Sequence, residues 1–273
     1  MNKEILVLGP TGNVGSRLTQ LLVESGADVR TGNRQDFDFF RPETYGPLFK
    51  GISELFLLTP LVPQMVELTA EILQAAKRSQ IRKIVRLSAL GSDKNSSSSI
   101  FRWHAECEGL IEESGIAYTI LRPNAFMQNF AKYYSPMIKA RGALFLPANG
   151  ARVSFVNAKD VAAVAQRCLS EKEHDGAILD LTGQEALSFQ EAASLIGHVM
   201  NRPISYSSIS QEIAREAMIE NGTPSWRADI LLGLYRHYRA GEAEMISQAI
   251  EKVLGRQPST FKDFIVEHRR DFT

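Results

Sequence analysis

The chain has 273 residues, of which 44% are hydrophobic and 23% charged, and its 31 basic and 31 acidic side chains give a formal net charge of zero at pH 7. This is the composition of a globular protein with ample core, and the balanced charge gives no reason to expect nucleic acid as a partner. The two cysteines, Cys107 and Cys168, lack metal-ligand spacing, so we expect free thiols, a reducing cytoplasm and no metal site. No signal peptide precedes the first apolar run, and no run approaches the ~20 residues of a membrane span, so we expect a cytoplasmic protein without a membrane partner.

The first predicted elements are a strand, a glycine turn and a helix. Residues 5–8 form an apolar run of the length of a buried parallel strand, and apolar residues recur at helical spacing from residue 14 to residue 22. Three glycines at spacing three lie at the junction, where a pyrophosphate can approach the backbone and meet the free N–H groups of the helix N-terminus. This context indicates dinucleotide binding, and a plain strand–helix turn is the alternative. The residues expected to contact the cofactor here are Gly9, Thr11, Gly12, Asn13, Val14 and Gly15.

The first half of the chain continues to alternate strands and helices. The hydrophobic pattern predicts strands at residues 27–31, 54–58, 83–88 and 117–121, and helices at residues 64–78 and 105–113. Between residues 31 and 54 there is room only for a loop, a brief strand at 36–39 and one helix that begins near Pro42. Repeated βαβ units predict an α/β fold with a Rossmann-type, doubly wound parallel sheet.

After Pro123 the pattern changes to loops and helices. Strands are predicted at residues 154–156 and 177–181, and helices at residues 158–169, 189–200, 211–221, 225–240 and 244–254. We therefore expect residues 1–123 to form a dinucleotide-binding Rossmann domain, with residues 151–183 returning to its sheet. Residues 124–150 and 184–273 are expected to form a smaller, mostly helical substrate-binding lobe.

The residues after the second strand bear on the choice of cofactor. NAD-dependent enzymes carry an acidic residue there for the ribose 2′-hydroxyl, whereas this chain has Asn33 and Arg34. A guanidinium can pair with the 2′-phosphate of NADP(H). We therefore expect NADP(H) rather than NAD(H), and a solvated loop charge is the alternative for Arg34.

Several short segments together resemble one enzyme family. They are residues 57–60, 87–89, 121–129, 156–162, 182–183 and 188–192, in addition to the glycine turn. Through them nearly the whole chain resembles the NmrA-like atypical short-chain dehydrogenase/reductases. Within that family, His104, Glu108 and residues 121–122 are similar to triphenylmethane reductase-like enzymes. Similarity to festuclavine (agroclavine) dehydrogenase-like enzymes lies in residues 32–34, 36–39, 44–45 and 261–264.

This resemblance implies NADP(H) binding and reduction of an imine, iminium, quinone or dye. It also implies an alternative, because some relatives bind the nucleotide and regulate without catalysis. The further cofactor-binding residues that it implies are Asp38 near the adenine amine, Thr59 and Pro60 along the cofactor, and Pro123 and Asn124.

The candidate catalytic residues depart from the pattern of the wider superfamily. A short-chain dehydrogenase uses a Ser and a Tyr-x-x-x-Lys motif, but the predicted helix at residues 102–113 carries His104 and Glu108 in those places, one turn apart on one face. Ser88 ends a strand that faces the nicotinamide region, and a capping role at the strand end is the alternative. His104 is either a proton donor near neutral pH or a structural residue. Reduction of a cationic iminium makes less demand on a proton donor than reduction of a carbonyl.

Aromatic residues of the second half are candidates for a substrate pocket. They are Phe126, Phe130, Tyr133 and Trp226, and packing in the core is the alternative for each. The sequence therefore predicts an NADPH-dependent reductase, an imine reductase among its possibilities, that acts on an apolar or planar small molecule as a monomer or a homodimer. A non-catalytic NADP(H)-sensing regulator is the other candidate.

Overall fold

The computed structural model describes residues 4–33 and 36–273, and its contacts divide the chain into two compact units. Unit 1 consists of Met1–Pro123, Ala158–Leu181 and Ala249–Arg256. Unit 2 consists of Asn124–Asn157, Thr182–Gln248 and Gln257–Thr273. The segment that returns to the sheet is thus shorter than residues 151–183, and a second segment near the C-terminus also joins unit 1.

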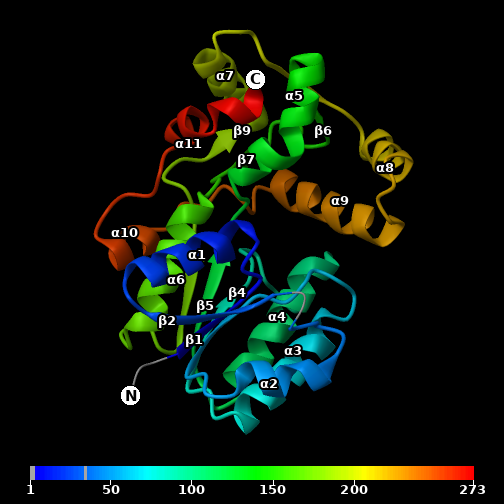
Figure 1. Ribbon diagram of the computed structural model, residues 1–273. Helices are drawn as coiled ribbons and strands as arrows, with labels where there is room; N and C mark the ends of the chain where they lie inside the picture. The colour runs from blue at the N-terminus through cyan, green and yellow to red at the C-terminus, as the bar shows by residue number, and fades with distance from the viewer. Residues whose placement is uncertain (1–3, 34–35) are drawn as a thin grey trace. The chain divides into compact units, whose positions relative to one another are not determined.

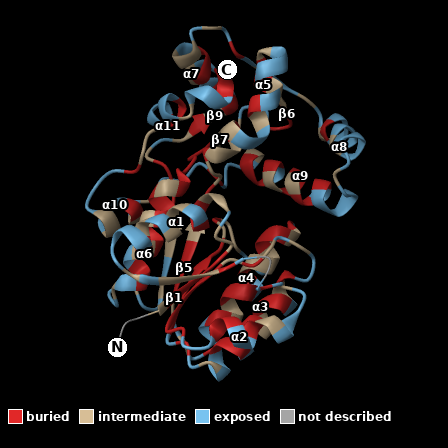
Figure 2. Cartoon of the chain, in the orientation of Figure 1, coloured by how far each residue is buried: buried red, intermediate tan, exposed pale blue. Residues whose placement is uncertain are grey.

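Unit 1 is built on one six-stranded parallel sheet with the strand order β2-β1-β3-β4-β5-β8 (Figure 1). Its central strands are buried along their length because helices cover both faces (Figure 2). The predicted doubly wound α/β fold is therefore confirmed. The strands are β1 (Glu4–Leu8), β2 (Asp28–Gly32), β3 (Glu54–Leu57), β4 (Lys83–Leu87), β5 (Ala117–Pro123) and β8 (Ala177–Leu181).

The helices of unit 1 form two layers (Figure 1). On one face α1 (Asn13–Glu24) packs against α6 (Ala158–Ser170), which also contacts the short α10 (Ala249–Leu254). On the other face α3 (Met65–Arg78) packs against α4 (Ser99–Glu112), beside α2 (Tyr45–Phe49). Buried aliphatic side chains of β1, β3, β4, α3 and α4 form the core between this second layer and the sheet.

The prediction of a brief strand at residues 36–39 is wrong. The carbonyl of Asn33 accepts hydrogen bonds from the backbone N–H groups of Asp36 and Phe37, and Asp36 belongs to a turn. The Phe37 ring is buried against Tyr45, 5.3 Å between ring centroids, so the segment is held by its side chain and needs no strand partner. The helix expected near Pro42 is present as a 3-10 turn, Pro42–Thr44, that leads into α2.

Unit 2 combines helices with two small sheets. The parallel pair β6 (Ala143–Leu146) and β10 (Ser205–Ser208) was not predicted, nor was the short helix α11 (Phe261–Glu267). The short helix α5 (Ser135–Arg141) lies in the segment after Pro123 that was expected to contain loops and helices. The longer helices are α7 (Phe189–Met200), α8 (Gln211–Glu220) and α9 (Ser225–Arg239), and a π-helical turn (Phe130–Tyr134) and a 3-10 turn (Arg269–Phe272) complete the set.

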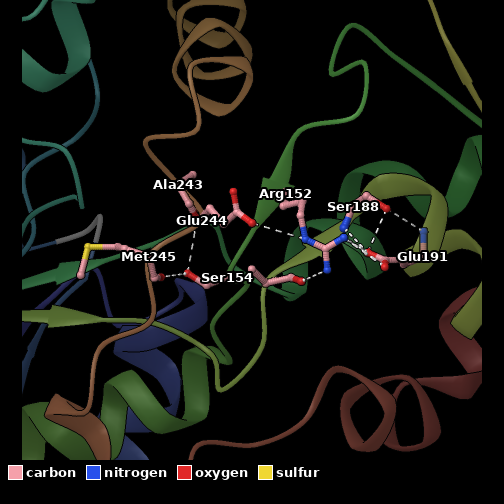
Figure 3. Close-up of polar contacts among 8 residues, drawn as sticks. Arg152, Ser154, Ser188, Glu191, Ala243, Glu244 and Met245 are labelled. Atoms are coloured by element: carbon pink, nitrogen blue, oxygen red, sulfur yellow. Dashed lines mark hydrogen bonds and ion pairs between the residues drawn. The ribbon is translucent and has the colours of Figure 1, made fainter.

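Two predicted elements of unit 2 differ from the structure. The strand expected at 154–156 lies two residues earlier, where β7 (Arg152–Val153) pairs antiparallel with β9 (Leu187–Ser188). The helix expected at 244–254 begins only at Ala249, because polar contacts hold the preceding segment against Arg152 and Ser154 at the end of β7. Figure 3 shows these contacts: the Ser154 hydroxyl donates to the Met245 carbonyl at 2.7 Å, and Arg152 lies between the carboxylates of Glu191 and Glu244.

Candidate active site

The candidate site lies at the carboxyl edge of the unit 1 sheet, on the face covered by α3 and α4. Side chains alternate along a strand, so Arg86 and Ser88 lie on the same face of β4 and its extension. The register pairs Arg86 with Leu57 of β3 and pairs Arg122 of β5 with Asp180 of β8. Parallel strands thus bring a row of polar side chains to one edge, where ligands of α/β sheets bind.

Glu108 of α4 contacts two side chains of this row, Ser88 and Arg122. Its side chain is 5% exposed, and its Oε1 accepts a 2.5 Å hydrogen bond from the Ser88 hydroxyl. Arg122 donates to the same carboxylate from Nε at 3.0 Å and from Nη2 at 2.5 Å, a two-pronged contact that suits a guanidinium. The hydrogen bond to Glu108 raises the pKa of Arg122, so the guanidinium stays charged.

His104 lies one helical turn before Glu108 on the same face of α4. Its Nδ1 is 3.3 Å from the Ser88 hydroxyl oxygen. Burial lowers the pKa of the imidazole from 6.5 to about 3, with a further contribution from the nearby Arg86 guanidinium. The structure therefore brings Ser88, His104 and Glu108 together, with a histidine that is neutral at physiological pH.

This neutrality can be measured. The unfolded imidazole takes up a proton as the pH falls through about 6.5, whereas the folded one does not until about 3, so the folded state loses stability over that window. We expect the Cε1–H resonance of His104, assigned by comparison with His104→Phe, to remain unshifted by NMR between about pH 8 and pH 4.5, above its lowered pKa. A titration midpoint near the ordinary value would contradict a neutral His104.

Arg86 is the residue that the sequence analysis missed. Its side chain is 0% exposed, and its Nη1 donates to the Thr59 hydroxyl at 2.6 Å. The Thr59 hydroxyl is in turn 3.2 Å from that of Thr69, so it faces the protein interior. Burial lowers the pKa of Arg86, and the neighbouring Cys107 and Glu108 oppose that shift. The signal in the sequence was an arginine within an apolar strand, two residues before the candidate Ser88.

The glycine turn has the geometry that a pyrophosphate needs. Gly9 has a φ of +71°, which favours glycine, and its carbonyl accepts from the Gly12 N–H at 3.0 Å. A Cβ on Gly15 would lie 2.1 Å from that carbonyl oxygen, so the turn requires glycine there. Helix α1 begins without a side-chain cap, which leaves its first N–H groups, near Thr11, Asn13 and Val14, for an anion. The residues present therefore fit a dinucleotide.

The other predicted cofactor residues of unit 1 have local partners. Asn33 donates from its side chain to Asp36 at 2.7 Å, and exposed Asp38 accepts from the Phe40 N–H at 2.9 Å. Pro60 follows Thr59 after β3, and the carbonyl of Pro123 accepts from the Leu90 N–H at 2.9 Å. Arg34 lies outside the described residues.

Asn124 belongs to unit 2, and its side chain is used there. Its Nδ2 donates to the Ser154 hydroxyl and to the Ala243 carbonyl, both at 2.8 Å, and its Oδ1 accepts from the Ala125 N–H. These bonds hold together the segments at 124–125, 154 and 243.

The four aromatic candidates have different environments within unit 2. Phe130 is 0% exposed and packs among three other phenylalanine rings, those of Phe155, Phe189 and Phe261. It is therefore a core residue, the alternative given for it in the sequence analysis. Tyr133 and Trp226 are exposed, and Phe126 is half-buried next to its backbone bridge to Val156.

The fold and this edge of the sheet are those of a dinucleotide-binding oxidoreductase. The model of the NmrA-like family matches residues 24–265, and the chain belongs to this family, which confirms the predicted resemblance. It is 32% identical to the NAD(P)H azoreductase of Xenophilus azovorans, over 98% of this chain and 99% of that one. It is 26% identical to festuclavine synthase II of Penicillium roqueforti, over 97% of this chain and 98% of that one.

Solved structures share the fold. The triphenylmethane reductase of a Citrobacter species superposes with a TM-score of 0.83 at 21% identity, covering 98% of this chain and 99% of that one. The NADPH-dependent quinone oxidoreductase of Escherichia coli gives a TM-score of 0.83 at 22% identity, with coverages of 97% and 99%. Both cysteines are free and buried, and none of the helices in the described part of the chain is long and apolar enough to span a membrane.

Proposed function

We propose that this protein is an NADPH-dependent reductase that transfers a hydride to an unsaturated small molecule of the imine, iminium, quinone or dye type. The oxidoreductase class follows from the family and from the NAD(P)H azoreductase relative, which aligns over nearly the whole chain. NADPH, when bound, supplies the hydride, and the chain supplies binding, orientation and electrostatics.

One observation carries the proposal: the glycine turn after β1 and the polar row after β4 and β5 lie at the same edge of one sheet. The turn offers backbone N–H groups to the pyrophosphate, and Arg34 is proposed for the 2′-phosphate. Ser88, His104 and Glu108 are then the groups proposed to face the nicotinamide and the substrate. Tyr133 and Trp226, which are exposed residues of unit 2, are proposed as substrate-binding residues.

The test is steady-state NADPH oxidation against a panel of imines, quinones, and azo and triphenylmethane dyes. We expect substrate-dependent oxidation with at least one class. Tight NADPH binding by calorimetry without oxidation by any member of the panel would overturn the reductase and favour the nucleotide-sensing regulator.

The choice between nucleotides is tested at Arg34. Arg34→Ala should weaken NADPH binding about ten- to a hundredfold and hardly change NADH binding, since a hydrogen bond to a charged group contributes roughly 1.5–3 kcal/mol and only NADPH carries the 2′-phosphate. Titration calorimetry with both nucleotides measures this. Exposed Arg41, which pairs with Glu43, provides the control: Arg41→Ala should change neither affinity. Equal weakening of both nucleotides in Arg34→Ala would contradict the assignment.

A further inference from the structure

The protons of the Ser88–Glu108–His104 group can be assigned from its distances. A serine hydroxyl has one proton, and an ionised carboxylate can only accept. Arg122 holds the Glu108 carboxylate with two hydrogen bonds, and the Ser88 oxygen is 2.5 Å from Glu108 Oε1. Two oxygens at this distance need a proton between them, so the Ser88 proton belongs to the bond with Glu108.

This assignment fixes the tautomer of His104. With its own proton committed, the Ser88 oxygen can only accept from Nδ1 of His104, 3.3 Å away. The neighbouring Ser92 does not compete, because its proton goes to the Ala89 carbonyl at 2.6 Å. Nδ1 therefore carries the ring proton, and Nε2 carries a lone pair. Among the described residues Nε2 has no hydrogen-bond partner, and the histidine is only half-buried.

We propose that Nε2 of His104 is a hydrogen-bond acceptor that determines specificity, and that the site takes iminium ions with an N–H on the double bond, that is, imines already protonated on nitrogen. This inference rests on the proposed reductase function and narrows its substrate class. A substrate N–H can donate to Nε2. A quinone oxygen would instead place its lone pairs against that of Nε2.

The electron balance agrees with this substrate class. When hydride adds to the carbon of a cationic C=N–H group, the π electrons pass to nitrogen, the cation becomes a neutral amine and the N–H proton stays in place. The protein then has no proton to deliver, which suits a site where Ser88 and His104 have committed theirs. The row also carries two arginines, Arg86 and Arg122, against two carboxylates, Glu108 and Asp180, so its formal charge does not exclude a cation.

The first experiment compares two matched substrates in the full-length protein with NADPH. They are 3,4-dihydroisoquinoline, which is protonated on nitrogen to give an N–H iminium, and its N-methyl iminium cation, which has no donor. We expect kcat/KM to favour the N–H substrate about ten- to a hundredfold, the range of one hydrogen bond to a charged group. His104→Phe should abolish this preference, and His104→Gln, whose carbonyl can accept, should restore part of it. Exposed His198 gives the control, because His198→Phe should keep the preference.

The second experiment observes the tautomer without turnover. In ¹⁵N-labelled protein near pH 7, long-range ¹H–¹⁵N correlation should show His104 protonated at Nδ1 and bare at Nε2. Ser88→Ala removes the acceptor for Nδ1–H, so this resonance pattern should shift toward the Nε2–H form.

Each result decides a different claim. An Nε2–H tautomer in the wild type, or equal kcat/KM for the two substrates, would overturn this inference and leave the reductase intact. Turnover of quinones or dyes without turnover of either iminium would overturn the substrate class alone. Absence of NADPH oxidation with every substrate would overturn the proposed function, while the NMR result would still test the tautomer.

Discussion

Gly12→Val should strongly weaken nucleotide binding and leave the fold intact. Gly12 precedes helix α1, where the backbone must meet the pyrophosphate, and a branched side chain would occupy that space. The φ of Gly12 is −78°, which any residue can adopt, and a Cβ there would approach only the Gly9 carbonyl oxygen, at 3.3 Å. We therefore expect NADPH affinity to fall by about a hundredfold or more, the effect of losing several charge-assisted hydrogen bonds.

Gly12 is the position where binding and folding can be separated. At Gly15 a Cβ would lie 2.1 Å from the same oxygen, so a substitution there would distort the turn itself. The control for an added valine is Gly46→Val in helix α2, where a Cβ would meet no heavy atom within 4 Å. Calorimetric titration with NADPH and thermal unfolding measure both properties. Unchanged affinity in Gly12→Val would remove the dinucleotide site from the glycine turn.

The sheet could be predicted because its signals are local. A run such as residues 5–8 is apolar throughout, since a parallel strand is buried on both faces, and the glycines at 9 and 12 mark where it ends. The brief strand at 36–39 was predicted wrongly because its alternating pattern, with aromatic side chains at 37 and 39, is also that of a turn that buries a ring. Helix α10 was predicted too long because no local signal shows that the Ser154 hydroxyl, about ninety residues away, holds Met245 in an extended segment.

The sequence could predict which residues form the candidate site, but it could not predict their hydrogen bonds or the lowered pKa of His104. The spacing of His104 and Glu108 placed both on one face of a helix, and Ser88 ends a neighbouring strand. Their partners come from elsewhere: Arg122 lies 14 residues after Glu108, on the next strand. Nothing in the helix pattern shows that the carboxylate accepts a hydrogen bond from Ser88, or that burial, with a smaller contribution from Arg86, lowers the pKa of His104. Such properties depend on strand register, which a sequence without pairing information does not specify.

Glu108→Ala should both destabilise the protein and strongly reduce its turnover. Removing the carboxylate leaves Arg122 without its partner and Ser88 without its acceptor, and breaking a buried ion pair costs about 3–5 kcal/mol. For a chain of this size the melting temperature should fall by roughly 6–20 °C, at about 2–4 °C for each kcal/mol. The control is Asp229→Ala, which breaks an exposed pair with Arg215 and should cost no more than about 1 kcal/mol.

A double variant separates the structural part of this effect from the functional part. In Glu108→Leu/Arg122→Met both charges are replaced by apolar side chains, and such replacements of buried ion pairs are often neutral or stabilising. The melting temperature should therefore recover toward that of the wild type. Turnover should not recover. Without Glu108 the Ser88 hydroxyl is free to donate elsewhere, so it no longer holds His104 in the tautomer with an unprotonated Nε2. The measurements are thermal unfolding and kcat/KM with the best substrate of the panel. Recovery of both stability and turnover would show that Glu108 serves only to neutralise Arg122, and would remove it from the catalytic group.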